Sequence, residues 1–306
     1  MAGQHLLGIR GLGRDAIHHI LDTAEGFREV SRRRIKKVPT LRGRTIVNAF
    51  FENSTRTRVS FELAAKRLSA DGVNVSASGT SVSKGESLID MAQTLGAMQL
   101  DAVVIRHGQS GAPHYLAERL DARIINAGDG QHEHPTQALL DLMTMRRHFR
   151  NLENLEVALV GDVAHSRVAR SNLLALHAVG AKVRVAGPRT LLPPGLEEAY
   201  HCTVCERVAD AVEGAHVVMA LRLQKERMVE GLLPSLREYA NEFGVNAALL
   251  ETTRPDAVLM HPGPVNRGVE LAPDVVDGPR SVILDQVENG VAVRAAILFL
   301  ILGGSE

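Results

Sequence analysis

Residues 50–62, FFENSTRTRVSFE, contain the end of a predicted strand and the start of a predicted helix. The apolar run Thr45–Phe51 predicts the strand, and apolar positions within Val59–Ser69 recur with helical spacing. Ser54 and Thr55 favour the N-cap position, so we expect the helix to begin at about Thr55. A strand followed directly by a helix is the repeating unit of a parallel sheet with helices on its faces.

The same alternation of strand and helix patterns continues on both sides of this stretch. Apolar runs predict further strands at residues 73–77, 102–106, 123–126, 157–160, 182–186, 216–220 and 257–260. Helical spacing predicts helices at about residues 14–31, 87–98, 113–118, 134–148 and 287–302. The pattern therefore predicts an α/β protein with two doubly wound parallel-sheet domains.

The break between the two series of strands predicts a domain boundary. We expect a first domain at residues 1–135, together with a C-terminal helix, residues 286–306, that packs back on it. Residues 136–285 then form the second domain. The length of 306 residues is enough for a sizeable core in each domain.

Composition excludes several classes of function. Lys and Arg together number 35, as do Asp and Glu, so the formal net charge is zero. Binding to nucleic acid or to a membrane surface needs a broad basic field, so we expect neither. The chain shows no secretory signal pattern and no apolar run of the roughly 18 residues that a membrane span needs. We therefore expect a cytoplasmic protein.

Two groups of residues raise the question of a metal. Cys202 and Cys205 form a C-x-x-C pair, but no second pair follows at a spacing that completes a tetrahedral zinc site. His132, Glu133 and His134 are potential ligands, but side chains of neighbours in sequence point apart. We expect reduced thiols, and neither a metal nor another cofactor.

The predicted helix start at Thr55 is suited to a phosphate group. A helix N-terminus supplies N–H groups without intrahelical partners and the positive end of the helix dipole. Arg56 adds a guanidinium fork that matches two phosphate oxygens. An ordinary capped helix with solvent-facing arginines explains the same residues, and the local pattern alone does not separate the two interpretations.

Four segments together resemble the aspartate and ornithine carbamoyltransferase family, in the order of the family. They are Ser54–Arg58 (STRTR), Ser81–Glu86 (SVSKGE), Val104–His107 (VIRH) and Asp129–Gly130 followed by His134–Asp141 (HPTQALLD). The resemblance covers essentially the whole chain. It implies transfer of the carbamoyl group of carbamoyl phosphate, at a site in a cleft between two domains.

The resemblance implies a carbamoyl-phosphate site made of matching residues. These residues are Ser54, Thr55, Arg56, Thr57, Ser81, Arg106, His134 and Gln137. Among them, Thr57, Arg106 and His134 resemble donors to the carbonyl oxygen, and Gln137 is similar to the residue that holds the carbamoyl NH2 group. By type alone, a histidine before a proline is more often a cap or a core hydrogen bonder.

The loop containing Ser81 and Lys84 resembles the family's loop that reaches into the neighbouring subunit's site. This resemblance places Lys84 among both the catalytic and the aspartate-binding residues, and Arg56 and Thr57 among the catalytic ones. It implies a homotrimer with shared active sites. Without the resemblance, a lysine in such a polar loop would be called solvated.

Two segments of the second half resemble the aspartate-binding part of the family. In Arg222–Arg227 (RLQKER), Arg222 and Gln224 match residues that bind aspartate carboxylates. Arg167, in the segment GDVAHSR, matches the arginine that binds the α-carboxylate. A dianionic amino acid needs two guanidinium forks aimed at one place. The implied reaction carbamoylates the aspartate amine, giving N-carbamoyl-L-aspartate and phosphate in pyrimidine biosynthesis.

The ornithine enzymes of the family are the nearest alternative. They carry an H-C-L-P segment late in the chain, whereas this chain has His261–Pro264 (HPGP), where Gly263 and Pro264 resemble aspartate-binding residues. The segment contains no cysteine and no obvious carboxylate for an ornithine ammonium. A cis peptide bond at Pro262 or Pro264 is compatible with the segment, because X–Pro bonds tolerate cis.

The chain departs from the common bacterial pattern at a few positions. The Ser81–Lys84 loop is one residue shorter with a single lysine, Gly263 replaces a common leucine, and Val168 replaces a frequent threonine. These departures remove no charged ligand. They leave feedback control open, as well as association with regulatory chains or a dihydroorotase. A catalytically silent scaffold is the alternative of another class, and the complete set of ligands argues against it.

Overall fold

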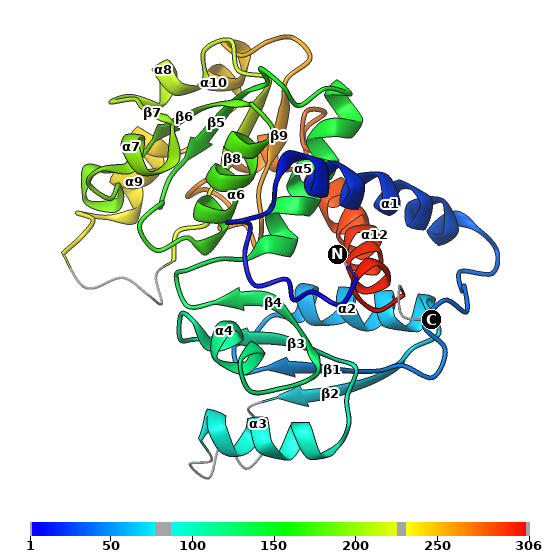
Figure 1. Ribbon diagram of the computed structural model, residues 1–306. Helices are drawn as coiled ribbons and strands as arrows, with labels where there is room; N and C mark the ends of the chain where they lie inside the picture. Colours follow the sequence, from blue (N-terminus) through cyan, green and yellow to red (C-terminus); the bar gives the residue numbers. More distant parts are fainter. Residues whose placement is uncertain (1, 77–86, 225–230, 304–306) are drawn as a thin grey trace. The chain divides into compact units, whose positions relative to one another are not determined.

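The computed structural model describes residues 2–76, 87–224 and 231–303. The chain divides into two compact units: unit 1 comprises residues 1–140 and 287–306, and unit 2 comprises residues 141–286. The boundary falls within two helices, α5 (Pro135–Phe149) and α12 (Ile283–Leu302). Each unit contains one parallel sheet with helices on its faces (Figure 1).

Unit 1 is built on a four-stranded parallel sheet. Its strands, in the spatial order β2-β1-β3-β4, are β1 (Thr45–Phe50), β2 (Asp71–Ser76), β3 (Ala102–His107) and β4 (Arg123–Asp129). The chain moves outward from β1 to β2 and then crosses back for β3 and β4. This reversal makes the position between β1 and β3 the switch point of the sheet, where ligands bind in open α/β folds.

Helices cover both faces of this sheet. Successive side chains of a strand point to opposite faces, so a strand that is apolar throughout buries side chains against helices on both sides. On one face, apolar residues of β1 and β3 pack with α3 (Leu88–Ala97) and α4 (Ala112–Ala117). Figure 1 shows α2 (Thr55–Arg67) on the other face. Strands buried on both faces appear in sequence as continuous apolar runs, which is the pattern that predicted them.

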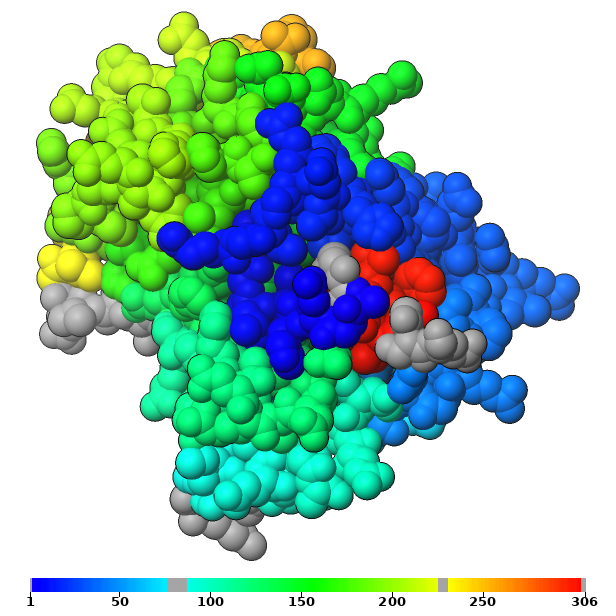
Figure 2. Space-filling view, in the orientation of Figure 1, coloured from blue at the N-terminus to red at the C-terminus, as the bar shows by residue number. Residues whose placement is uncertain are grey.

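The C-terminal helix α12 packs on unit 1, as predicted. Phe299 of α12 is in edge-to-face contact with Phe27 of α1 (Arg14–Arg32), with 5.5 Å between ring centroids. The Gly3 N–H donates to the Ile301 carbonyl (3.1 Å), and Figure 2 shows the first residues beside this helix. Although α12 is apolar, no helix among the described residues is long and apolar enough to span a membrane.

Unit 2 contains a five-stranded parallel sheet. Its strands, in the order β7-β6-β5-β8-β9, are β5 (Glu156–Val160), β6 (Lys182–Ala186), β7 (Thr203–Val204), β8 (Val217–Ala220) and β9 (Val258–Met260). Its further helices are α6 (Arg167–Ala178), the 3-10 turn η2 (Arg189–Leu191), α7 (Leu196–Tyr200), α8 (Val208–Val212), α9 (Leu236–Phe243), α10 (Ala247–Glu251) and α11 (Pro273–Val276). The reversal of direction puts the switch point between β5 and β8.

The predicted fold class is confirmed, but the helices between the strands of unit 2, α6 to α11, were not individually predicted. β7 has only two residues and was not predicted, because so short a strand has no recognisable period. The helix expected to begin at about Thr55 does begin there, and it ends at Arg67, two residues before the predicted end at Ser69. It stops there because Ser69 adopts a left-handed conformation (φ 63°), which no helix residue has. α12 begins at Ile283, four residues before the predicted start.

A buried polar network in unit 2 joins residues of three helices, α5, α6 and α12, to the segment after β9. Asp141 in α5 accepts hydrogen bonds from Gln286 Nε2 in α12 (2.8 Å) and from Asn172 Nδ2 in α6 (2.9 Å). Gln286 Oε1 in turn accepts the backbone N–H of His261 (3.0 Å). The amide of Gln286 therefore serves a buried carboxylate and a buried backbone donor at once.

Replacing Gln286 tests how much this network contributes to the free energy of unfolding. Gln286→Leu removes a donor from Asp141 and the acceptor of the His261 N–H, and each orphaned buried group costs about 1–3 kcal/mol. We expect the free energy of unfolding, measured by urea titration, to fall by about 2–4 kcal/mol. Leu284→Ala, at an 82% exposed position two residues away, is the control, with an expected change within about 0.5 kcal/mol. Equal stability of the two variants would contradict the assigned role of Gln286.

Candidate active site

The residues singled out in unit 1 lie at the carboxyl ends of adjacent strands. Phe50 of β1 pairs with Arg106 of β3, and His107 of β3 pairs with Asp129 of β4. Because the strands are parallel, the segments that follow them leave the sheet at the same edge. The start of α2, Arg106 and the turn before His134 therefore share the edge that contains the switch point between β1 and β3.

The start of α2 has the features of an anion site. Ser54 occupies the N-cap position, and Thr55, Arg56 and Thr57 form the first turn, as predicted. The Ser54 side chain makes no capping hydrogen bond, and the first turn contains no acidic residue. Arg56 is exposed and Thr57 is buried. The positive end of the helix dipole is thus not countered by a carboxylate within the turn.

Arg106 contacts residues on both sides of its strand at the sheet edge. Its Nε lies 3.5 Å from Oε2 of Glu52, in the connection that also carries Ser54. Its Nη1 donates to the carbonyl of Ala127 in β4 (3.2 Å). The guanidinium is therefore oriented by a β1–α2 residue on one side and by β4 on the other.

His134 and Gln137 are fixed by the start of α5. Pro135 is the first residue of this helix, a position that suits proline. Both side chains are buried, and the His134 carbonyl accepts the Gln137 N–H (3.0 Å). The two side chains therefore belong to one rigid helix start that follows β4.

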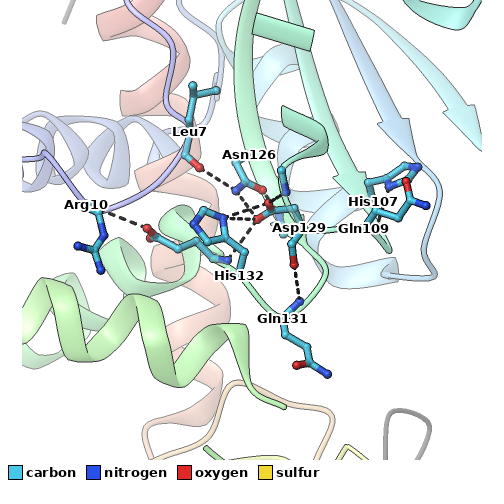
Figure 3. Close-up of polar contacts among 12 residues, drawn as sticks. Leu7, Arg10, His107, Gln109, Asn126, Asp129, Gln131 and His132 are labelled. Atoms are coloured by element: carbon cyan, nitrogen blue, oxygen red, sulfur yellow. Dashed lines mark hydrogen bonds and ion pairs between the residues drawn. The ribbon is translucent and has the colours of Figure 1, made fainter. Parts of the chain in front are cut away.

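A fully buried carboxylate, Asp129, stands at the end of β4, before the turn that leads to α5 (Figure 3). It accepts hydrogen bonds from the Gly111 N–H (2.7 Å), Asn126 Nδ2 (2.8 Å), His132 Nδ1 (3.1 Å) and the Glu133 N–H (3.2 Å). Burial alone would raise the pKa of Asp129, but the hydrogen bonds from His132, Gly111 and Asn126 outweigh it and hold the pKa below its usual value.

The same cluster contains a set of potential metal ligands. Among the described residues, His114, Asp129 and His132 bring ligand atoms within 4.8 Å of one another. Both oxygens of Asp129 already accept N–H donors, so we interpret the group as a hydrogen-bonded cluster. Glu133 points elsewhere, because its carboxylate accepts the Ile9 N–H (2.6 Å).

In unit 2, the segments that follow β5 and β8 lie side by side at the second switch point. Val160 pairs with Ala220, and the Leu221 N–H donates to the Val160 carbonyl (2.7 Å). Arg167 is buried at the first position of α6, in the segment after β5. In the segment after β8, Arg222 Nη1 lies 3.5 Å from Gln224 Oε1.

Two carboxylates position the backbone of the segment after β8. The Leu223 N–H donates to Glu270 Oε1 (2.7 Å), and the Gln224 N–H donates to Asp162 Oδ2 (3.3 Å). The buried phenol of Tyr239 lies near both carboxylates. Its pKa is raised, first by burial and then by the charges of Glu270 and Asp162. The loop that carries Arg222 is therefore anchored through its main chain.

The segment after β9 reaches the same edge, because β9 is the neighbour of β8. The peptide bond between Gly263 and Pro264 is cis, in agreement with the sequence analysis. Gly263 has a φ of 63°, a conformation that favours glycine, and its N–H donates to His261 Nδ1 (2.8 Å).

The predicted residues fall into three groups. Unit 1 brings together Ser54, Thr55, Arg56, Thr57, Arg106, His134 and Gln137 at one sheet edge, and unit 2 brings together Arg167, Arg222, Gln224, Gly263 and Pro264 at another. Ser81 and Lys84 lie outside the described residues, as does the segment 225–230.

Sequence analysis missed the carboxylates that support the loops. Asp129 and Asp162 stand in quoted segments next to glycine, directly after predicted strands, which is a recognisable signal for a loop anchor. Glu133 was considered only as a metal ligand. Glu270 has no recognisable signal, because its distant partner Leu223 is found only in the folded chain.

The C-x-x-C pair has the environment of inert thiols. Cys202 is buried and Cys205 is half-buried, and both are free. Burial raises the pKa of Cys202 to about 11 and also raises that of Cys205. A raised pKa lowers the thiolate fraction on which both metal binding and redox exchange depend.

Comparison with protein-family models gives two adjacent matches. Residues 4–147 match the aspartate/ornithine carbamoyltransferase, carbamoyl-P binding domain. Residues 153–301 match the aspartate/ornithine carbamoyltransferase, Asp/Orn binding domain. Together the two matches account for nearly the whole chain.

Individual proteins give the same result. The aspartate carbamoyltransferase catalytic subunit of Syntrophotalea carbinolica is 59% identical over 99% of this chain and 96% of its own length. That of Sorangium cellulosum is 60% identical over 97% and 92%. The structure of aspartate transcarbamoylase from Trypanosoma cruzi in complex with carbamoyl phosphate and aspartate has a TM-score of 0.90 at 29% identity, over 98% of this chain and 97% of that one. Ornithine carbamoyltransferase from Pyrococcus furiosus has a TM-score of 0.89 at 30% identity, over 100% and 99%.

Alkylation tests the state of the two thiols. At pH 8, a pKa of about 11 leaves about one Cys202 side chain in a thousand as thiolate. We expect iodoacetamide to modify Cys202 of the folded protein at least about 100-fold more slowly than it modifies a free thiol, as followed by mass spectrometry. In guanidinium the two cysteines should react at the free-thiol rate. Rapid modification of Cys202 in the folded protein would show that the thiol is activated.

Proposed function

Because this chain belongs to the aspartate/ornithine carbamoyltransferase family, we propose that it acts as an aspartate carbamoyltransferase catalytic subunit. The reaction joins the carbamoyl group of carbamoyl phosphate to the amine of L-aspartate, giving N-carbamoyl-L-aspartate and phosphate. The curated relatives that share 55–60% of its residues carry this name. The reaction belongs to pyrimidine biosynthesis.

One observation favours aspartate over ornithine as the acceptor. The second switch point presents Arg167, Arg222 and Gln224, two guanidinium forks and an amide, from adjacent segments. Such forks form bidentate pairs with carboxylates and repel the ammonium of an ornithine side chain. The main chain of Gly263 and Pro264 at the same edge completes the proposed aspartate-binding set.

Unit 1 supplies the proposed carbamoyl-phosphate site. The start of α2, with Ser54, Thr55, Arg56 and Thr57, offers N–H groups, hydroxyls and a guanidinium to the phosphate oxygens. Arg106 reaches the phosphate and the carbonyl oxygen from the end of β3. Gln137, in the first turn of α5, holds the carbamoyl NH2 group.

The chemical step is an attack of the neutral aspartate amine on the carbamoyl carbon. Negative charge develops on the carbonyl oxygen, and Thr57, Arg106 and His134 donate to it as an oxyanion hole. The C–O bond to phosphate then breaks, and the departing phosphate accepts the amine proton. The substrate is itself an activated acyl donor, so the residues position and stabilise, and no covalent enzyme intermediate is required.

We propose a homotrimer in which Ser81 and Lys84 complete the site of a neighbouring subunit. Exposed apolar side chains support a contact surface on unit 1: Val59 and Leu63 lie four residues apart on α2, and Val73 lies on the edge strand β2. Apolar groups gathered at a sheet edge are typical of subunit contacts.

The two free thiols favour a cytoplasmic location, where thiols stay reduced.

The choice of acceptor tests the function directly. With carbamoyl phosphate as donor, we expect the purified protein to convert aspartate to carbamoyl aspartate and to form negligible citrulline from ornithine, as measured by mass spectrometry of the products. Equal or greater activity with ornithine would overturn the assignment.

A pair of variants extends this acceptor test. Arg222→Ala should raise the KM for aspartate by about 10–100-fold, since hydrogen bonds to charged groups contribute about 1.5–3 kcal/mol. Arg207→Ala is the matched control, because Arg207 is an exposed arginine of unit 2 that pairs only locally, with Asp210.

Reassembly of mixed subunits tests the shared site. Arg56→Ala and Lys84→Ala should each be nearly inactive, because each removes a cation from every site. In a mixed trimer, some sites take Arg56 from one chain and Lys84 from its neighbour, so activity should return in part. Hybrids that form, as shown by native mass spectrometry, but stay at the activity of the parents would place Lys84 in its own chain's site.

A further inference from the structure

We propose that Asp129 is a positioning residue: it fixes the loop after β3 to the turn before α5, and thereby sets the positions of Arg106 and His134 for the proposed reaction. The inference rests on the proposed function for its catalytic consequence, and on the hydrogen bonds of unit 1 for its structural part.

The turn before α5 is closed around Asp129. The Asp129 backbone N–H donates to the Glu133 carbonyl (3.1 Å), and the Glu133 N–H donates to the Asp129 carboxylate (3.2 Å). His132 faces the same carboxylate through Nδ1, which carries a proton there because a carboxylate only accepts. His134 follows directly, so its backbone position depends on this closed turn.

The loop after β3 is joined to the same turn at three points. The Gly111 N–H donates to Asp129 Oδ2 (2.7 Å), the Gly130 N–H to the His107 carbonyl (2.9 Å), and the Gln131 N–H to Ser110 Oγ (3.3 Å; Figure 3). We call these three hydrogen bonds the junction between the loop after β3 and the turn before α5. Asp129 provides its charged member. Arg106, which precedes His107, also donates to Ala127 in β4.

Close packing confirms that the two segments have little freedom. A Cβ on Gly130 would lie 2.6 Å from the backbone nitrogen of Ser110 and 3.1 Å from the carbonyl oxygen of Gly108. The φ of Gly130 is also positive, at 46°. Position 130 therefore accepts no side chain without moving the loop after β3 away from the turn.

A third segment, residues 7–10, is tied to the same junction. Asn126 Nδ2 donates both to Asp129 Oδ1 (2.8 Å) and to the Leu7 carbonyl (2.8 Å). The Glu133 carboxylate accepts the N–H groups of Ile9 (2.6 Å) and Arg10 (3.4 Å). The turn before His134 is therefore supported on one side by the loop after β3 and on the other by the N-terminal segment.

Asp129 cannot itself be a ligand of the anionic substrate. Its side chain is fully buried, and both of its oxygens accept N–H donors. A carboxylate facing a phosphate would repel it, whereas a carboxylate whose charge is taken up by four donors serves as a rigid anchor. Its effect on the reaction passes through Arg106 and His134.

Asp129→Asn is the sharpest test, because it keeps the shape of the side chain. One oxygen becomes an NH2 group, which must face either the Gly111 N–H or the donors of Asn126 and Glu133. The junction then opens on one side. A misplacement of ~1 Å can cost about 100-fold in rate, so we expect kcat to fall by roughly 10–100-fold. The KM for aspartate should change by less than about twofold, because the carboxylate-binding arginines belong to unit 2.

Asp101→Asn is the matched control within the same sheet. Asp101 precedes β3 at the amino edge, where it accepts from Arg44 Nη1 (2.8 Å) and the Thr45 N–H (2.8 Å). The same substitution therefore sets an NH2 group against a donor at the edge away from the site. We expect kcat to stay within about twofold of the wild-type value.

Hydrogen–deuterium exchange gives a readout that does not depend on activity. In Asp129→Asn and in Gly130→Ala, peptides that cover residues 107–111 and 129–134 should exchange faster than in the wild-type protein, and in Asp101→Asn they should not. Unchanged exchange in Asp129→Asn would overturn the anchoring role. An equal loss of kcat in Asp101→Asn, or faster exchange without a loss of kcat, would overturn the positioning role. A wild-type protein that forms no carbamoyl aspartate would overturn the proposed function instead, and the exchange result would still decide the anchoring.

Discussion

The parallel pairing of β1 with β3 and of β5 with β8 is the constraint on which the rest of the structure depends. In each sheet the chain starts at a central strand, adds strands on one side and then crosses to the other. The connections after the two central strands consequently diverge, and the carboxyl ends leave room between them. Ser54 and Arg106 lie near the first such point, and Arg167 and Arg222 lie near the second. Neither pair is close in sequence, so strand order brings each pair to its sheet edge.

Carboxylates behind the arginines explain how a neutral chain can build sites for anions. Glu52 contacts Arg106, Asp129 anchors the turn before His134, and Asp162 and Glu270 anchor the segment that contains Arg222. Each carboxylate accepts N–H donors or a guanidinium, so its buried charge is compensated locally. The formal net charge stays at zero although arginines gather near the carboxyl ends of the strands.

The sequence predicted most of the fold because strands buried on both faces are continuous apolar runs. Val47 and Val103 stand in such runs, and the predicted positions of both strands are confirmed. Short elements such as β7 carry too few residues for a period. The residues at the sheet edges were found through four segments of a known family, since local physics left the start of α2 ambiguous between a cap and a phosphate site. Glu270 could not be found in this way, because its role depends on the hydrogen bond to Leu223, which only the folded chain brings near it.

The proposed reaction gives the residues of unit 1 and those of unit 2 different tasks. Transition-state stabilisation requires donors aimed at an oxygen whose charge develops only briefly, so small displacements matter most in unit 1. There the turn before His134 is fixed from two sides, through Gly111 and through Ile9. In the proposed function, Arg167 and Arg222 of unit 2 meet carboxylates that carry their charge throughout the reaction. The segment after β8 is anchored there through the main chain of Leu223 and Gln224 rather than through the side chains proposed to meet the substrate.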